Sequence, residues 1–176
     1  ALLFYGSAIG ISNTSSWSAV GGQSTAFFGL SVSTAGDVNG DGYSDVIVGA
    51  NKFTNGQTDE GKIFVYHGSS SGLSASPNWT AESDQATARF GVSVATAGDV
   101  NGDGYSDIIA GTRLFDNGES DEGKAFVWYG SSSGLGPNGL PSNADWSGEG
   151  NQATAYFGYS VSAAGDVNGD GYSDII

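Results

Sequence analysis

Ten residues, Gly36 to Asp45, recur without change as Gly98 to Asp107 and as Gly165 to Asp174. Counted from the first aspartate, each copy has Asp, Asn, Asp and Asp at positions 1, 3, 5 and 9, Gly at position 6 and Tyr at position 7. Alternate side chains of this kind can surround a hard cation, because the glycine permits a sharp turn and the carbonyl at position 7 supplies another oxygen. Oxygen donors without His or Cys favour Ca²⁺ over zinc or copper, and several carboxylates in an irregular loop favour it over Mg²⁺.

The alternative for these loops is a plain tight turn, which Asp, Asn and Gly often make. Three carboxylates placed so close together would repel one another, by up to about 4 kcal/mol per pair at roughly 4 Å and an effective dielectric near 20. Because the loop occurs in three identical copies, a metal-binding loop is favoured over a plain turn. An EF-hand or dockerin-like loop does not fit, because position 12 is Val48 in the first copy and Ala110 in the second. The residues after each loop are β-branched runs closed by Gly, which predict buried strands and not helices.

The composition predicts an all-β protein. The chain has 176 residues, of which 30 are Gly and only 3 are Pro, and 38% of them are hydrophobic. Cysteine is absent, so disulfide and thiol chemistry are excluded. The net charge of -14 would fall to -8 with three bound Ca²⁺ ions, and this acidity disfavours nucleic acid or an anionic membrane as a partner. No transmembrane run is visible, and we expect no membrane insertion.

Self-similarity organises the whole chain, because the loop aspartates Asp37, Asp99 and Asp166 recur after 62 and then 67 residues. Each period contains a Phe-Gly segment, the acidic loop, an apolar strand, a hairpin ending in Asp-Glu-Gly-Lys, another strand, and a strand headed by Trp79 or Trp146. The five extra residues of the second period fall in 136–143, which predicts a surface loop. Four strands per repeat predict a single β-propeller domain of four-stranded blades, about three per chain. The expected boundaries are half blade 1–20, blade 21–82, blade 83–147 and half blade 148–176.

Three blades do not close a ring, since propellers usually need about four to eight. Residues 1–6 match a third strand and Trp17 heads a fourth, whereas the segment before Ile176 supplies a first and second strand. Complementary halves predict a homodimer that closes a six-bladed ring through composite blades. The alternative is that this chain is part of a longer propeller.

The Phe28-Gly29 pair, the Asp37 to Asp45 loop and Gly49-Ala50 resemble the FG-GAP repeat found in the N-terminal propellers of integrin α subunits and in bacterial surface proteins. The resemblance covers nearly the whole chain, although no Pro follows Gly49-Ala50 or Gly111-Thr112. It implies Ca²⁺ in the loop between the first and second strands of each blade, at three sites per chain. The implied ligands, with tyrosine contributing its carbonyl, are Asp37, Asn39, Asp41, Tyr43 and Asp45; Asp99, Asn101, Asp103, Tyr105 and Asp107; and Asp166, Asn168, Asp170, Tyr172 and Asp174.

Other residues could do chemistry but are assigned structural roles. His67 is the only histidine, and its counterpart in the next repeat is Tyr129, so a catalytic triad is not indicated. The acids Asp59-Glu60 and Asp121-Glu122 lie beside Gly in repeated hairpins and are expected to be solvated turn residues, not a glycosidase pair. The tryptophans that recur once per repeat are expected to pack between blades, the alternative being a surface that stacks sugars.

The sequence thus predicts a calcium-binding propeller without catalytic residues, which serves as an adhesion or ligand-binding scaffold. Loops of this kind fill where Ca²⁺ is near millimolar, which indicates an extracellular or cell-surface protein, and the near-identical repeats indicate a secreted bacterial one. The alternatives are a lectin-like propeller or the propeller part of a secreted hydrolase, because a fold alone does not select a function. No feature of the sequence identifies the ligand.

Overall fold

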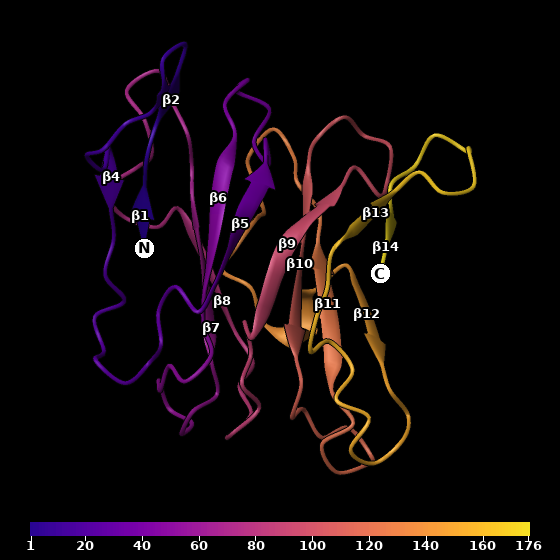
Figure 1. Ribbon diagram of the computed structural model, residues 1–176. Coiled ribbons are helices and arrows are strands. Elements are labelled where there is room, and N and C mark those ends of the chain that lie inside the picture. Colours follow the sequence, from indigo (N-terminus) through magenta and orange to yellow (C-terminus); the bar gives the residue numbers. More distant parts are fainter.

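The computed structural model describes residues 1–176 as an all-β protein built on two four-stranded antiparallel sheets (Figure 1). The first sheet, called blade one below, contains β5 (Ser31–Gly36), β6 (Asp45–Ala50), β7 (Lys62–Tyr66) and β8 (Trp79–Glu82). The second, blade two, contains β9 (Ser93–Gly98), β10 (Asp107–Thr112), β11 (Lys124–Trp128) and β12 (Trp146–Glu149). In both sheets the strands lie in sequence order, as the repeat predicted.

The remaining strands form incomplete sheets at the two ends of the chain. β1 (Leu2–Leu3) pairs with β4 (Trp17–Ser18), and the hairpin of β2 (Gly6–Ser7) and β3 (Gly10–Ile11) lies between them in sequence. β13 (Ala163–Gly165) pairs with β14 (Asp174–Ile175). No helix of the structure has the length and hydrophobicity that a membrane-spanning segment needs.

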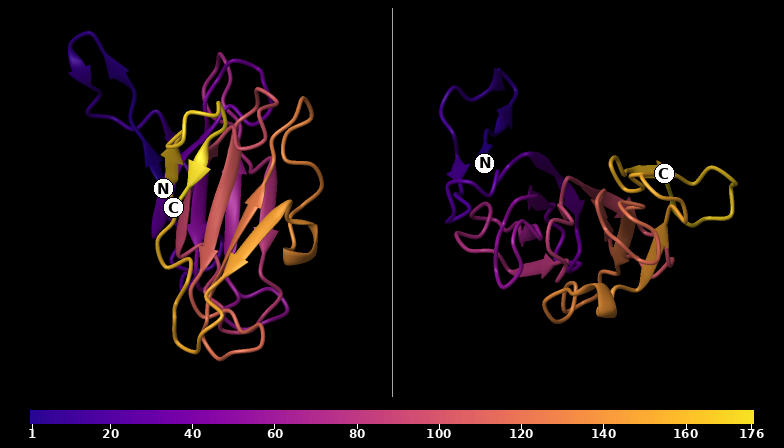
Figure 2. Two further views of the ribbon diagram at one scale, coloured as in Figure 1. Left: turned by 90° about the vertical axis from the view of Figure 1, so that its right-hand side faces the viewer. Right: turned by 90° about the horizontal axis from the view of Figure 1, so that it is seen from below.

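The elements follow one another along an arc, which is visible when the molecule is seen from below (Figure 2, right). The first strands of successive repeats, β5, β9 and β13, are neighbours on this arc. Fourteen buried hydrophobic residues, among them Ile47, Phe90 and Trp128, fill the space between blade one and blade two. A second cluster lies between blade two and the C-terminal strands, and a third between blade one and the N-terminal strands. Each sheet thus packs face to face on the next, as propeller blades do.

The Phe-Gly segment of one repeat packs on the Gly near the end of the second strand of the preceding repeat. The Phe90 amide donates to the Glu60 carbonyl (2.9 Å), which attaches the start of blade two to the hairpin of blade one. A Cβ placed on Gly49 would collide with the carbonyl oxygen of Gly91, and one placed on Gly111 would collide with that of Gly158. Glycine is therefore required at this position by the close approach of two backbones.

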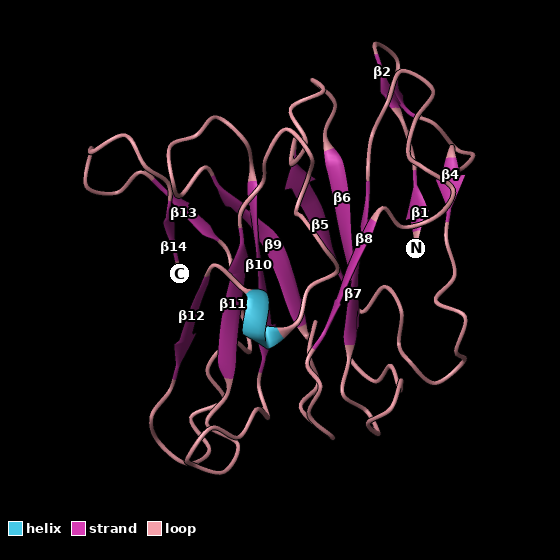
Figure 3. Cartoon of the chain, turned by 180° about the vertical axis from the view of Figure 1, so that it is seen from behind, coloured by secondary structure: helices cyan, strands magenta, loops and turns pink.

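The inserted segment of the second repeat lies against the outer edge of blade one and contains the only helical turn, η1 (Pro141–Asn143) (Figure 3). The Gly139 amide donates to the Thr80 carbonyl (2.8 Å), and the Glu82 amide donates to the Gly139 carbonyl (3.2 Å). The indole Nε1 of Trp79 donates to the Pro137 carbonyl (2.7 Å). The insertion is a surface loop, as predicted, and it also pairs with the edge strand β8, which protects that edge.

Candidate metal centres

The three repeated acidic segments lie at the same end of the sheets (Figure 1). Residues 37–44 join β5 to β6, residues 99–106 join β9 to β10, and residues 166–173 join β13 to β14. They are called loops one, two and three below. Each loop therefore connects the first and second strands of its repeat, which is the position that the resemblance implied.

The first aspartate of each loop accepts hydrogen bonds from backbone amides of its own loop. Asp37 accepts hydrogen bonds at Oδ1 from the amides of Gly40 (2.7 Å) and Asp41 (3.1 Å), and at Oδ2 from the amide of Gly42 (2.8 Å). Asp99 and Asp166 repeat this pattern in loops two and three. In loop three, the amides of Gly171 and its neighbours hold the pKa of Asp166 below its usual range. These amides determine the shape of the loop tip.

The last aspartate of the loop is buried in blades one and two. Asp45 opens β6 and accepts hydrogen bonds from the Val38 amide (2.9 Å) and the Gly68 amide (2.8 Å), so it connects its loop to the end of β7. Asp107 occupies the same position in blade two, with bonds from Val100 and Gly130 (both 2.8 Å). Burial raises the pKa of Asp45 and raises that of Asp107 to about 6, because a carboxylate loses hydration there.

The third and fifth positions meet at the loop tip. The Asn39 side chain accepts from the Asp41 amide (3.1 Å) and donates to Asp41 Oδ2 (3.2 Å). Asp41 Oδ1 accepts from the Tyr43 amide (2.9 Å). The structure thus brings the predicted ligands of each copy into one short loop. It does not gather three carboxylates of any loop within 4.8 Å of one another, since the last aspartate points toward the end of the third strand.

The donor set of these loops fits a hard cation. Every side chain concerned offers carboxylate or amide oxygen, and none offers nitrogen from His or sulfur. A carboxylate has about four lone-pair sites, so the two backbone hydrogen bonds on Asp45 leave room for a further partner. The cost of burying Asp45 and Asp107 without a positive charge is a second reason to expect a cation near them.

Neighbouring loops are joined to one another, which sequence reasoning missed. The Ser106 amide of loop two donates to the Asp37 carbonyl of loop one (3.0 Å), and the Ser173 amide of loop three donates to the Asp99 carbonyl of loop two (2.9 Å). The Ser131 amide, just after β11, donates to the Val38 carbonyl (3.1 Å). The three loops are therefore one connected surface. The repetition of Tyr and Ser at fixed loop positions is the only sequence signal for these contacts.

Three residues that the sequence analysis assigned structural roles, His67, Trp17 and Trp79, make structural contacts, although their partners were not predicted from sequence. His67 Nδ1 lies 3.2 Å from the side-chain Nδ2 of Asn39, so the single histidine supports loop one. The ring of Trp79 is 3% exposed and packs edge-on against Trp128, with centroids 5.4 Å apart. Trp17 packs in the same way on Tyr66 (4.9 Å). These two tryptophans pack between sheets and are not an open sugar-binding surface.

The prediction for the paired hairpin acids was wrong in part. Glu60 and Glu122 are buried, at 0% and 1% exposure, and are not solvated turn residues. Each accepts hydrogen bonds from its own hairpin backbone, Glu60 from Asn55 (2.7 Å) and Glu122 from Asn117 (2.7 Å). The glutamate therefore folds inward to close the hairpin, while the aspartate before it has a positive φ at the surface. The Asp-Glu-Gly pattern alone does not show which of the two acids turns inward.

Successive four-stranded sheets, with an oxygen-rich loop between the first and second strand of each, define the chain as a repeat protein of the β-propeller class. The FG-GAP repeat family matches this sequence over residues 28–66, 90–128 and 157–176. The chain belongs to the FG-GAP repeat family. The three matched segments each begin at the Phe of the Phe-Gly pair.

Curated relatives include integrin α chains. Integrin alpha-PS2 of Drosophila melanogaster is 32% identical over 167 residues, which cover 88% of this chain and 12% of that protein. Integrin alpha-V of Gallus gallus is 32% identical over 172 residues, covering 93% of this chain and 16% of that protein. Integrin alpha pat-2 of Caenorhabditis briggsae is 44% identical over 96 residues, or 52% of this chain. The chain thus spans less than a fifth of the length of these relatives.

Proposed function

We propose that this chain is a non-catalytic, calcium-stabilised propeller scaffold that binds proteins or other ligands in adhesion at the cell surface or outside the cell. The observation that carries the proposal is the set of three identical oxygen-rich loops, joined to one another at one end of successive blades. The family and the similarity to integrin α chains support it. A calcium level near millimolar outside cells suits such loops, and the near-identical repeats suggest a secreted bacterial protein.

Each loop would hold Ca²⁺ through the side chains at positions 1, 3, 5 and 9 and the Tyr carbonyl at position 7. The ion would supply the positive charge that three carboxylates need. Two side chains of the loop act without the ion. Asp37 accepts backbone hydrogen bonds that set the shape of the loop tip. Asp45 connects the loop to Gly68 after the third strand. Ca²⁺ is therefore structural in this proposal, because it joins strand ends that already meet.

The test is a calcium titration with the variant Asp103→Ala. Isothermal calorimetry of the intact chain should give one bound Ca²⁺ fewer than wild type, because Asp103 is the fifth-position ligand of loop two. Glu119→Ala removes one carboxylate outside the loops and should leave the stoichiometry unchanged. Unchanged stoichiometry in Asp103→Ala, or no calcium binding by wild type, contradicts the proposal.

The open face of blade one supports a proposal for what would complete a ring. Val32 on β5 is 58% exposed, whereas its counterparts Val94 and Val161 are 6% and 8% exposed because the preceding blade covers them. Val32 and Trp17 line a groove of about 910 Å³ between blade one and the β1–β4 pair. Two strands of the kind that β13 and β14 provide would fill this groove. We propose that an FG-GAP strand pair occupies it.

That strand pair can come from two sources. In a homodimer, β13 and β14 of each chain would complete the blade begun by β1 and β4 of the other, which closes a six-bladed ring. In a longer propeller, a further repeat of the same protein would supply them. Light scattering after size exclusion in calcium decides between them, since a mass of two chains supports the dimer and a mass of one chain contradicts it. Val32→Asp should then convert the dimer to monomer, because it buries a charge at the composite interface.

A further inference from the structure

A second group of acidic side chains lies at the opposite end of blade one from loop one. Glu60 precedes β7, Glu82 ends β8, and Asp84 follows two residues later. Each offers a carboxylate oxygen, and these oxygens all lie within 4.8 Å of one another. β7 and β8 pair with Lys62 opposite Glu82, so the group is held at the end of two adjacent strands. It is called the lower acidic group below.

The buried member of this group has a carboxylate oxygen without a partner. Glu60 is 0% exposed, and its Oε1 accepts hydrogen bonds from the amides of Asn55 (2.7 Å) and Gln57 (3.4 Å). Its Oε2 is buried and has no hydrogen-bond partner. A buried, unpartnered carboxylate oxygen is costly because it has lost its water and gained nothing in exchange. Such an oxygen, beside two further carboxylates, indicates a missing positive charge.

The cations of the chain do not supply enough charge. Lys62 forms an ion pair with Glu82 at 2.5 Å, and the Asn55 side chain donates to the other oxygen of Glu82 at 2.9 Å. Arg89, in the next repeat, is paired with Asp59 at 3.0 Å and not with the lower acidic group. Three carboxylates against one ammonium leave two negative charges. One divalent cation would balance them.

We propose that Glu60, Glu82 and Asp84 bind a divalent cation of the Ca²⁺ type, at a site separate from the three repeated loops. Glu60 Oε2 would be the buried ligand, and Asp84, which is exposed, would close the site on the solvent side with water. Ligands made only of oxygen, with an open side for water, suit Ca²⁺. The site would fasten the hairpin before β7 to the end of β8 and to the segment that enters blade two.

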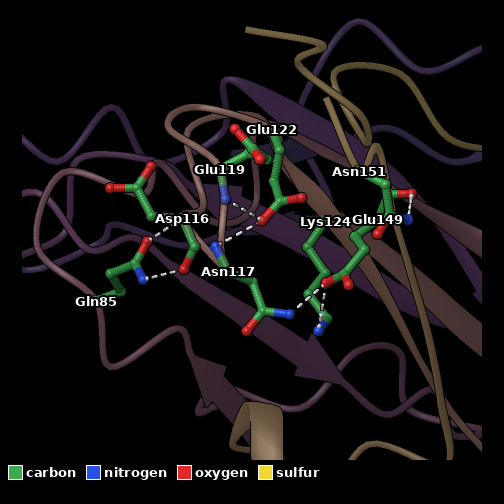
Figure 4. A network of polar contacts seen from close by, with 8 residues as sticks. All are labelled: Gln85, Asp116, Asn117, Glu119, Glu122, Lys124, Glu149 and Asn151. Carbon is green, nitrogen blue, oxygen red and sulfur yellow. Dashed lines mark hydrogen bonds and ion pairs between the residues drawn. The ribbon is translucent and has the colours of Figure 1, made fainter. Parts of the chain in front are cut away.

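Blade two carries a natural counterpart that lacks one carboxylate (Figure 4). Glu122 and Glu149 occupy the positions of Glu60 and Glu82, and Lys124 contacts Glu149 at 3.0 Å. Asn151 stands where blade one has Asp84, and its side-chain amide donates to the Glu149 carbonyl (3.3 Å). Two carboxylates against one ammonium leave a single negative charge. The proposal therefore assigns a cation to blade one alone.

The experiment exchanges this one residue between the blades and counts bound Ca²⁺ by equilibrium dialysis of the intact chain. Asp84→Asn gives blade one the same residue types as blade two at these three positions, Glu, Glu and Asn, and should lose one bound Ca²⁺ relative to wild type. Asn151→Asp gives blade two the third carboxylate and should gain one. Circular dichroism in chelator should be the same for all three proteins, because residues 84 and 151 lie at the surface or at a turn.

A second variant, Glu60→Gln, keeps the shape of the buried side chain and should also lose one Ca²⁺. If Asp84→Asn and Glu60→Gln both retain the wild-type count, Lys62 alone balances the group and the proposal is overturned. The two proposals can fail independently. The bound Ca²⁺ count of Asp103→Ala tests loop two, whereas the counts of Asp84→Asn and Glu60→Gln test the lower acidic group.

Discussion

The ring of Tyr105 in loop two lies directly over Gly40 in loop one, so closely that a Cβ on Gly40 would collide with it. Tyr172 in loop three covers Gly102 in loop two in the same way. The tyrosine at position 7 thus has a packing role, in addition to the carbonyl that the proposed function assigns to Ca²⁺. Together with the serine amides that donate to Asp37 and Asp99, it makes each loop part of the support of its neighbour.

The contact predicts different costs for two glycines of the same loop. Gly40 and Gly42 have φ values of 73° and 86°, so an alanine at either position costs about 1–2 kcal/mol of backbone strain. Only Gly40→Ala also pushes against Tyr105, which adds about 1–3 kcal/mol. Urea denaturation should therefore show a larger loss of unfolding free energy for Gly40→Ala than for Gly42→Ala, which faces open space. Equal losses would mean that Tyr105 simply moves aside.

A second prediction concerns the glycine that meets the Phe-Gly segment of the next repeat. Gly111→Ala places a methyl group on the carbonyl of Gly158, and Gly111 cannot move away freely because β10 is paired with a strand on each side. We expect a loss of about 3 kcal/mol, at the upper end of overpacking costs. Gly6→Ala is the control, because a Cβ there meets nothing within 4 Å. A Gly111→Ala protein as stable as the Gly6→Ala protein would contradict the close approach.

The strand order could be predicted from sequence because the information is local and repeated. The run Val46-Ile47-Val48 after an acidic turn indicates a buried strand, and three copies of the turn give the period. The contact between Gly49 and Gly91 could not be predicted, because it joins residues of different blades. The pairing of Gly139 with Thr80 was missed for the same reason: an insertion indicates a surface loop but not the edge that it covers.

The candidate site also has features that the sequence predicts and features that it does not. Which residues share a loop follows from their spacing, so Asp37, Asn39 and Asp41 were placed correctly at one loop tip. Where the buried acids point does not follow from spacing. Asp45 turns toward the backbone amide of Gly68 in another segment, and Glu60 folds under its own hairpin toward the amide of Asn55. Only the folded chain shows these donors, and they decide which carboxylates are desolvated.

Two of the three tryptophans that open fourth strands, Trp79 and Trp146, should differ in their contribution to stability. Trp79 is 3% exposed between blades one and two, whereas Trp146 is 41% exposed, although both begin the same strand of their repeats. Trp79→Ala should lower the unfolding free energy by about 3–5 kcal/mol, because it leaves a large cavity beside Trp128. Trp146→Ala should cost clearly less. Guanidinium denaturation of both variants measures the difference, and the reverse order would contradict the packing described here.

The last prediction separates the calcium-dependent part of stability from the rest. Asp107→Asn keeps the shape of the buried side chain but removes its charge, and one of its two backbone hydrogen bonds is lost. A site that binds only the folded chain adds about 2.7 kcal/mol at a hundredfold excess of Ca²⁺ over Kd. We therefore expect the difference in unfolding free energy between calcium and chelator to be smaller by about that amount in Asp107→Asn than in wild type. Chemical denaturation in both conditions measures it. If the variant gains as much from calcium as wild type does, Asp107 is not a ligand, and its burial serves only to hold Val100 and Gly130.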